Sequence, residues 1–264
     1  MRILYVGDVM GETGLQVVEL VVPELRAEKQ IDLVIAQAEN VTDGRGITPA
    51  DFALLKAVGV DFCTGGNWSL YQDDIVPALD DPLQPIIRPA NYPERTPGLG
   101  YKYVSNAIGK ILIVSLLGRI VGKDADKPVD NPLKVIDQIL ESQQDTEKVG
   151  TIVNFHGDYS SEKVMIGHYL DGRVTAVIGD HWHVPTADAR VLPNSTAHIT
   201  DVGMCGALDA SLGVKFNSVI PRWRDSVKRR NILETEGPKQ FNAVLIESND
   251  QGLANSIEQI QRVF

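Results

Sequence analysis

The stretch DLVIAQAEN at residues 32–40 decides the fold class of this chain. Its apolar run over 32–38 is typical of a strand buried on both faces, and the run stops at the polar pair Glu39 and Asn40. Shorter runs at 3–6 and 60–64 have the same form, and segments with helical spacing lie between them. This alternation of buried strands and helices predicts an α/β fold.

The same patterns continue along the chain and define the expected elements. We expect strands at 3–6, 32–38, 60–64, 110–117, 150–155, 174–178 and 241–247, and helices at 15–28, 49–58, 132–142, 161–170 and 253–263. Pro23 is a candidate interruption of the first helix, and the Pro- and Gly-rich segment 80–100 predicts an extended, irregular connection. Two charged segments, 119–131 and 222–238, are expected on the surface. Without an internal repeat or a composition break, we expect a single domain over 1–264.

The bulk composition excludes several function classes. The 264 residues are 43% hydrophobic, which is ordinary for a globular protein, and the net charge of −10 argues against a partner as extended as nucleic acid or an anionic membrane. A small phosphate substrate stays compatible, because bound cations reverse the local field. The chain opens directly on a strand, without a signal peptide or a membrane span, so we expect a cytoplasmic protein. In the reducing cytoplasm, we expect Cys63 and Cys205 to be buried thiols and not to form a disulfide.

Five of the predicted strands end in side chains that bind metal ions. These residues are Asp8, Glu39, Asn40, Asn67, His156, His181 and His183. They can converge, because sites in α/β sheets form beyond the carboxyl ends of the strands. Carboxylate and amide oxygens combined with imidazoles describe a transition-metal site, and a carboxylate such as Glu39 can bridge two ions. If 181–183 is extended, its two imidazoles face the same side. The sequence therefore predicts a two-metal centre.

The motifs that contain these residues resemble a known superfamily. GDV at 7–9, AEN at 38–40, GGN at 65–67, FH at 155–156 and HWH at 181–183 resemble the calcineurin-like metallophosphoesterases, and more narrowly their bacterial branch of YmdB-like cyclic-nucleotide phosphodiesterases. Further similar stretches include SEK at 161–163 and ITDVGM at 199–204. The resemblance covers residues 1 to about 215. It implies a four-layer α-β-β-α sandwich with two packed mixed β-sheets, and assembly into a homodimer or tetramer.

The resemblance also implies a division of the ligands between two metal ions. Iron is the expected metal, with manganese, zinc or magnesium as alternatives. The first ion would be bound by Asp8, Glu39, Asn40 and His183, and the second by Glu39, Asn67, His156 and His181. The family hydrolyses phosphodiesters with a metal-bridging hydroxide, and small phosphate esters such as 2′,3′-cyclic nucleotides are the implied substrates.

One position departs from the pattern. The superfamily has a histidine after the asparagine that corresponds to Asn67, and this chain has Trp68. Indole is not a general acid, and loss of one typically costs ~10²–10⁴-fold in rate. Asp43 and Asp180 could replace the donor only if their pKa values were raised. Trp68 itself could stack on a nucleotide base or cover the rim of the site, and both interpretations stay open.

Two functional hypotheses follow from this departure. The first is an active dinuclear-metal phosphodiesterase, with activity weakened by Trp68 beside the metal ligand Asn67. The second is a catalytically impaired regulatory protein that binds metal and nucleotide. Asn91, with Arg88, could contact substrate or shape the irregular connection, and the sequence does not separate these roles.

Overall fold

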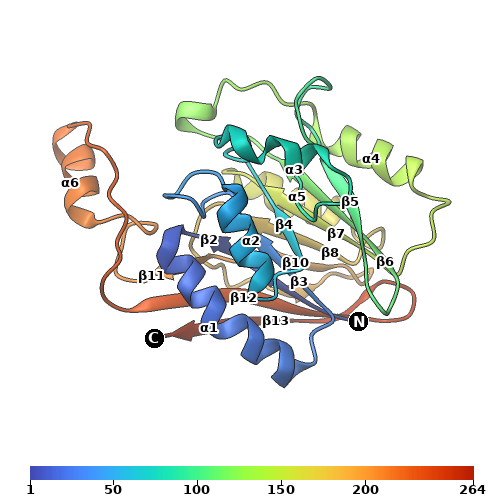
Figure 1. Ribbon diagram of the computed structural model, residues 1–264. Helices are drawn as coiled ribbons and strands as arrows, with labels where there is room; N and C mark the ends of the chain where they lie inside the picture. Colours follow the sequence, from blue (N-terminus) through green and yellow to red (C-terminus); the bar gives the residue numbers. More distant parts are fainter.

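The structure is a computed structural model that describes residues 1–264, except for the side chain of Lys123. Two mixed β-sheets face each other and carry helices on their outer faces (Figure 1). The first sheet has the order β2-β11-β12-β1-β3-β4, with β13 paired to β12, and the second has the order β5-β6-β7-β8-β10-β9. The four-layer architecture implied by the resemblance is confirmed.

The strands of the first sheet are β1 (Arg2–Val6), β2 (Asp8–Val9), β3 (Leu33–Gln37), β4 (Phe62–Thr64), β11 (Met204–Ala207), β12 (Lys239–Ser248) and β13 (Ala254–Val263). Those of the second are β5 (Tyr101–Ser105), β6 (Lys110–Leu117), β7 (Gly150–His156), β8 (Ala176–Asp180), β9 (Arg190–Val191) and β10 (Ala197–Ile199). The α-helices are α1 (Gly11–Lys29), α2 (Pro49–Ala57), α3 (Val76–Asp80), α4 (Pro132–Ser142), α5 (Ser160–Tyr169) and α6 (Phe216–Asp225), and short 3-10 helices cover Asp73–Ile75 and Gly122–Asp124.

Alternation along the central strands explains the layers. In β1, Ile3 and Tyr5 face the second sheet, whereas Leu4 and Val6 face α1. The central strands are buried on both faces, which is why their sequences are continuously apolar. Parallel pairing of β1 with β3, β3 with β4, and β7 with β8 brings their carboxyl ends to one edge of the sandwich.

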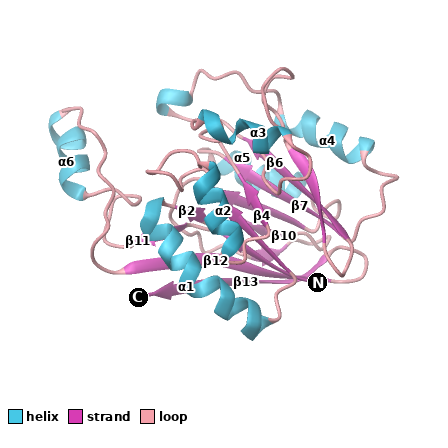
Figure 2. Cartoon of the chain, viewed as in Figure 1, coloured by secondary structure: helices cyan, strands magenta, loops and turns pink.

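One predicted element is wrong. The segment expected as a helix over 253–263 is the strand β13, which pairs with β12 along its whole length (Figure 2). A tight turn enforces this pairing: Asn249 Oδ1 accepts hydrogen bonds from the backbone N–H groups of Gln251 and Leu253, and Gly252 has φ +75°. Cross-strand pairing over ten residues overrides the weak helical pattern.

The other predicted helices and strands are present, with shifts of a few residues at their ends. The strand at 110–117 and the helix at 132–142 have the predicted bounds. Pro23 lies inside α1 and does not end it. Cys63 and Cys205 are buried free thiols, not a disulfide. Among the described residues, none of the helices combines the length and hydropathy that a membrane span requires.

Candidate metal centre

His156, the last residue of β7, lies where the two sheets meet. Its Nε2 is 2.8 Å from Glu39 Oε1 and 3.0 Å from Asn67 Oδ1, and the ring is fully buried. Glu39 and Asn67 follow β3 and β4 of the opposite sheet, so the contact joins strand ends from both sheets. The His181 ring packs edge-on against the His156 ring, with 4.4 Å between the ring centroids. Glu39, His156 and His181 offer ligand atoms that all lie within 4.8 Å of one another.

Asp8 and His183 extend this group on the side of the first sheet. His183 Nε2 lies 3.8 Å from Asp8 Oδ1, and the backbone N–H of His181 donates to Asp8 Oδ2 over 3.3 Å. Asp8, His156 and Asp180 form a second set of ligand atoms within 4.8 Å of one another. All of these side chains are buried except that of His181, which is partly exposed.

The polar atoms of this group fit a metal site. Among the described residues, Asp8 Oδ1 and His183 Nδ1 are buried without a hydrogen-bond partner, an arrangement that is costly unless a cation compensates it. Glu39 Oε1 is buried as well, and its one close neighbour is the His156 ring, at 2.8 Å. Burial, together with the charges of Asp180, Asp201 and Glu39, raises the pKa of Asp8 well above its ordinary value. Burial and the neighbouring imidazoles lower the pKa of His183 to about 3, which leaves the neutral ring that metal ions bind.

The charge around His156 leads to the same conclusion. Burial opposes protonation of its ring, but Glu39 and Asp180 raise the pKa of His156 well above its ordinary value. Asp180 faces Nδ1 and Glu39 faces Nε2, so a proton on Nε2 occupies the position that a metal ion would compete for, since metal binding displaces such protons. The donor set therefore attracts a positive charge.

The two asparagines present their amide groups differently. Asn67 donates from Nδ2 to Asp124 Oδ2 over 3.1 Å, which directs its Oδ1 toward His156. Asn40 donates from Nδ2 to the carbonyl of Gly44 over 3.0 Å, and this bond is compatible with Oδ1 as a ligand. All seven residues predicted from strand ends thus lie at this edge of the sandwich.

The condition under which the two imidazoles of 181–183 would face the same side is not met. The segment 181–183 is not extended: His181 has φ +106° and His183 has φ +63°, both in the region that side chains rarely adopt. The two rings consequently face different partners, His181 toward His156 and Asp158, and His183 toward Asp8. Such backbone strain is typical of functional sites.

Asp180 orients the histidine at the centre of the group. Its Oδ1 lies 2.6 Å from His156 Nδ1, and its Oδ2 accepts a hydrogen bond of 2.9 Å from the Tyr5 hydroxyl. Burial alone would raise the pKa of Asp180, but the hydrogen bond and charge of His156, with the charge of Lys163, lower it. Asp180 therefore remains a carboxylate, and the idea that it replaces the missing proton donor is not supported. Partners of this kind fix the ring of a metal-ligating histidine.

A buried ion pair that sequence reasoning missed supports the 181–183 segment. Lys163 in α5 is fully buried, and its Nζ donates to the Asp180 carbonyl over 2.6 Å and to Asp201 Oδ2 over 2.7 Å. Asp201 also accepts the backbone N–H of Trp182 over 2.9 Å. The stretches SEK and ITDVGM contain these two charges, and only their joint burial reveals the pairing.

Trp68 lies at the rim of the group and is half-buried. Its backbone N–H donates to Glu39 Oε2 over 2.8 Å, and its ring borders a cavity of about 290 Å³ that Asn67 and Lys127 also line. The Arg45 guanidinium lies 4.8 Å from the ring centroid, and Tyr71 contacts the ring edge-on. The indole is thus positioned to contact a ligand in this cavity, and both stacking and covering of the rim fit the geometry.

Asn91 and Arg88 have contacts that fit the shaping of the irregular connection. The Asn91 amide is fully buried, donates to the carbonyls of Leu117 and Asp130, and accepts from the Leu117 N–H. Arg88 donates to the carbonyls of Pro89, Pro97 and Thr96. Because these bonds occupy its polar atoms, we do not propose Asn91 as a substrate contact.

Comparisons with known proteins find similar chains over nearly the whole length of this one. The family model described as YmdB-like protein matches residues 4–260. A 2′,3′-cyclic-nucleotide 2′-phosphodiesterase of Bacillus subtilis (strain 168) is 37% identical over 251 residues, which cover 95% of this chain and 92% of that protein.

Solved structures share the fold over the whole chain. A crystal structure of a novel phosphatase from Mycoplasma pneumoniae superposes with a TM-score of 0.92 at 30% identity and covers 100% of this chain and 93% of the other. A hypothetical protein from Thermus thermophilus superposes with a TM-score of 0.90 at 33% identity, covering 100% and 99% of the two chains.

Proposed function

This chain belongs to the YmdB-like family, and we propose that it is a metal-dependent phosphodiesterase that hydrolyses 2′,3′-cyclic nucleotides. The observation that supports this most strongly is the group of buried carboxylate and imidazole atoms at the junction of the sheets, among which Asp8 Oδ1 and His183 Nδ1 have no hydrogen-bond partner. The name of the Bacillus subtilis relative suggests the substrate class.

The proposed ligand sets follow the residues around His156. Asp8, Glu39, Asn40 and His183 would hold one ion, and Glu39, Asn67, His156 and His181 the other. When bound, two such ions supply Lewis acidity that activates water and neutralises phosphate oxygens. Iron is our first candidate, with manganese, zinc or magnesium as alternatives. A cytoplasmic location and a homodimer or tetramer remain proposals.

The residues of the chain itself hold and orient the reacting groups. Asp180 fixes the His156 ring, and the Trp68 backbone N–H fixes Glu39, which both ions would share. Arg45 and Lys127 flank the Trp68 ring and favour an anionic substrate there. Because a five-membered cyclic phosphate is strained, its P–O bond breaks with less help from an acid, and this suits a site with indole in place of imidazole.

A second candidate function has one observation in its favour. Trp68 occupies the position of the usual proton donor, which is what a metal- and nucleotide-binding regulatory protein with weak turnover would show. The two functions differ in their kinetics and not in their ligand sets.

The experiment is a comparison of two substrates with metal-loaded protein, whose metal content is measured independently. Glu39→Gln serves as the site variant and Glu141→Gln, on the exposed face of α4, as its matched control. Turnover of 2′,3′-cyclic nucleotides by the wild type and the control, but not by Glu39→Gln, would support the phosphodiesterase. Turnover only of an aryl phosphodiester with a good leaving group would show that protonation of the alkoxide is lost. Binding of cyclic nucleotide without turnover of either substrate would favour the regulatory protein.

A further inference from the structure

The charge of this chain is unevenly distributed. Residues 215–230 contain six basic side chains and one acidic side chain, in a protein whose total charge is −10. We call residues 215–235 the basic arm; they comprise α6 and the residues that follow it. The basic arm projects from the body of the sandwich (Figure 1). The basic arm has a positive net charge and the rest of the chain a negative one, so the arm is suited to an anionic ligand.

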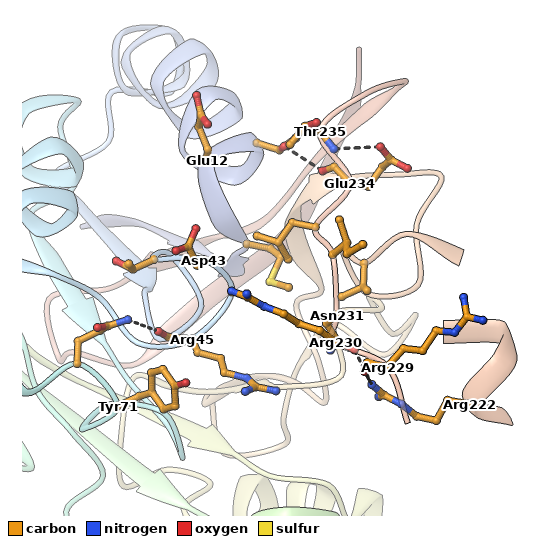
Figure 3. A pocket seen from close by; sticks show the side chains of 18 residues that line it. Glu12, Asp43, Arg45, Tyr71, Arg222, Arg229, Arg230, Asn231, Glu234 and Thr235 are labelled. Atoms are coloured by element: carbon orange, nitrogen blue, oxygen red, sulfur yellow. Dashed lines mark hydrogen bonds between the residues drawn. The ribbon is translucent and has the colours of Figure 1, made fainter. Parts of the chain in front are cut away.

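A cavity of about 840 Å³ lies between the basic arm and the loop 42–45. Arg45 and Tyr71 line it from the body, and Arg222, Arg229 and Arg230 line it from the arm. Figure 3 shows Arg45 and Arg230 reaching into this space from opposite sides. The carboxylates of Glu12, Asp43 and Glu234 also line it. The cavity thus combines cationic groups with hydrogen-bond acceptors.

This cavity shares a wall with the smaller cavity beside the metal centre. Tyr71 lines both it and the smaller cavity of about 290 Å³, which Asn67 and Trp68 also line. Arg45 lines the larger cavity while its guanidinium lies 4.8 Å from the Trp68 ring. A ligand path through both cavities would run from Asn67 and Trp68 in the smaller one to Arg230 in the larger one.

We propose that this path binds the 3′ end of a single-stranded RNA, so that the substrate is an oligoribonucleotide that ends in a 2′,3′-cyclic phosphate. The inference rests on the proposed phosphodiesterase activity. Cations along a groove with interspersed aromatic rings are what proteins use to bind single strands, through phosphates and stacked bases. The carboxylates disfavour a uniformly anionic ligand such as polyphosphate, whereas they can accept hydrogen bonds from base amino groups and ribose hydroxyls.

The net charge of −10 predicted no extended nucleic-acid partner, and the proposal refines that expectation. Net charge describes the whole surface, whereas the cationic groups here are concentrated in one segment and one loop. The proposed contact spans a short 3′ end and does not require a broad basic face.

Two double variants separate the cavity from the general charge of the arm. R229Q/R230Q removes two charges that line the cavity, and R224Q/K228Q removes two charges of the same arm outside it; the Arg224 side chain is 74% exposed and pairs with Asp225. Each metal-loaded protein would be assayed on 2′,3′-cyclic AMP and on a pentaribonucleotide with the same cyclic terminus, across a salt series. Circular dichroism would verify folding.

We expect wild-type kcat/KM to be higher for the pentaribonucleotide than for 2′,3′-cyclic AMP. R229Q/R230Q should lower the pentaribonucleotide value about tenfold, at least fivefold more than it lowers the 2′,3′-cyclic AMP value. It should also reduce the slope of log kcat/KM against log salt by about 1.4, at ~0.7 per phosphate contact on a single strand. R224Q/K228Q should change either value less than twofold.

Other outcomes overturn the inference and leave the proposed function distinguishable. Equal effects of the two double variants would mean that the arm attracts RNA only through its overall charge. Hydrolysis of 2′,3′-cyclic AMP without preference for the pentaribonucleotide would show that the cavity does not bind the RNA. If the wild type hydrolyses neither substrate, the proposed function fails instead. Fluorescence anisotropy of the labelled pentaribonucleotide then decides the inference: weaker binding by R229Q/R230Q alone supports it, and equal binding by all three proteins overturns it.

Discussion

Gly66 is required at its position by the ring that packs over it. A Cβ atom there would lie 2.3 Å from His156 Cδ2, far inside van der Waals contact. We predict that Gly66→Ala displaces the His156 ring and weakens metal binding at least tenfold, as loss of ligand positioning typically does. Metal titration followed by elemental analysis would measure this effect.

The matched control is Gly206→Ala in β11, where the added Cβ would be 3.3 Å from Met10 Cβ. This variant should retain its metal. Equal metal affinity of Gly66→Ala and wild type would mean that the His156 ring is not fixed by this close approach.

We expect Trp68 to determine how the proposed reaction depends on its leaving group. We predict that Trp68→His raises kcat on 2′,3′-cyclic nucleotides, because imidazole can protonate the departing alkoxide; since the strained ring needs less help from an acid, the gain should be near the lower end of the ~10²–10⁴-fold range of general-acid catalysis. Activity on an aryl phosphodiester, whose leaving group needs no proton, should change little. Steady-state kinetics on both substrates tests this, and no gain on cyclic nucleotides would contradict a catalytic defect at this position.

At the scale of elements, α5 stabilises the strained segment after β8 through one buried charge. Lys163 and Asp201 pair at 2.7 Å with both side chains fully buried. Lys163→Met leaves Asp201 buried without its partner, so the free energy of unfolding should fall by ~3–5 kcal/mol, the usual cost of breaking a buried pair. Denaturant unfolding measures this.

The double variant Lys163→Met, Asp201→Leu provides the control for that prediction. If the cost arises from the unpaired charge, removing both charges should restore part of the lost stability. If the double variant is as unstable as the sum of both single variants, the pair contributes through packing alone.

Elements whose pattern is local could be predicted from the sequence, whereas those that depend on distant partners could not. The runs at 32–38 and 110–117 are apolar because both faces of their strands are buried, and that burial is written in the residues themselves. By contrast, β13 is a strand because of its pairing with β12. The grouping of polar side chains at the strand ends was predictable because the strand ends were.

The limits at the site have the same origin. The conformation of 181–183 depends on Asp8 and Asp201, which lie far away in the chain, so the local pattern could not decide whether this segment is extended. The cavity beside the basic arm joins residues near 45 to residues near 230, and no spacing rule connects them.

At the scale of the whole molecule, the proposed metal centre joins the two sheets. Ligands come from strand ends of both, so metal ions would bind the folded state and not the unfolded chain. At metal concentrations near 1,000 times Kd this contributes about 4 kcal/mol. We predict that chelation lowers Tm by roughly 8–16 °C, at ~2–4 °C per kcal/mol for a chain of this size. Differential scanning calorimetry with and without chelator, followed by metal addition, would measure this; an unchanged Tm would contradict a shared centre.

Asp8 should affect the stability of the metal-free and the metal-loaded protein in opposite directions. Its folded-state pKa is raised above the unfolded value by burial and by neighbouring carboxylates, so the folded state binds the proton more tightly. The contribution of Asp8 to stability therefore grows as pH falls through the folded pKa and is lost as pH rises through it. In metal-free protein, Asp8→Asn should remove this dependence and raise Tm at neutral pH, whereas in metal-loaded protein it should lower Tm because a ligand is lost. Thermal unfolding at several pH values, with and without metal, tests whether the change in Tm reverses its sign. If Asp8→Asn lowers Tm equally in both states, Asp8 is structural and its carboxylate is not held for a cation.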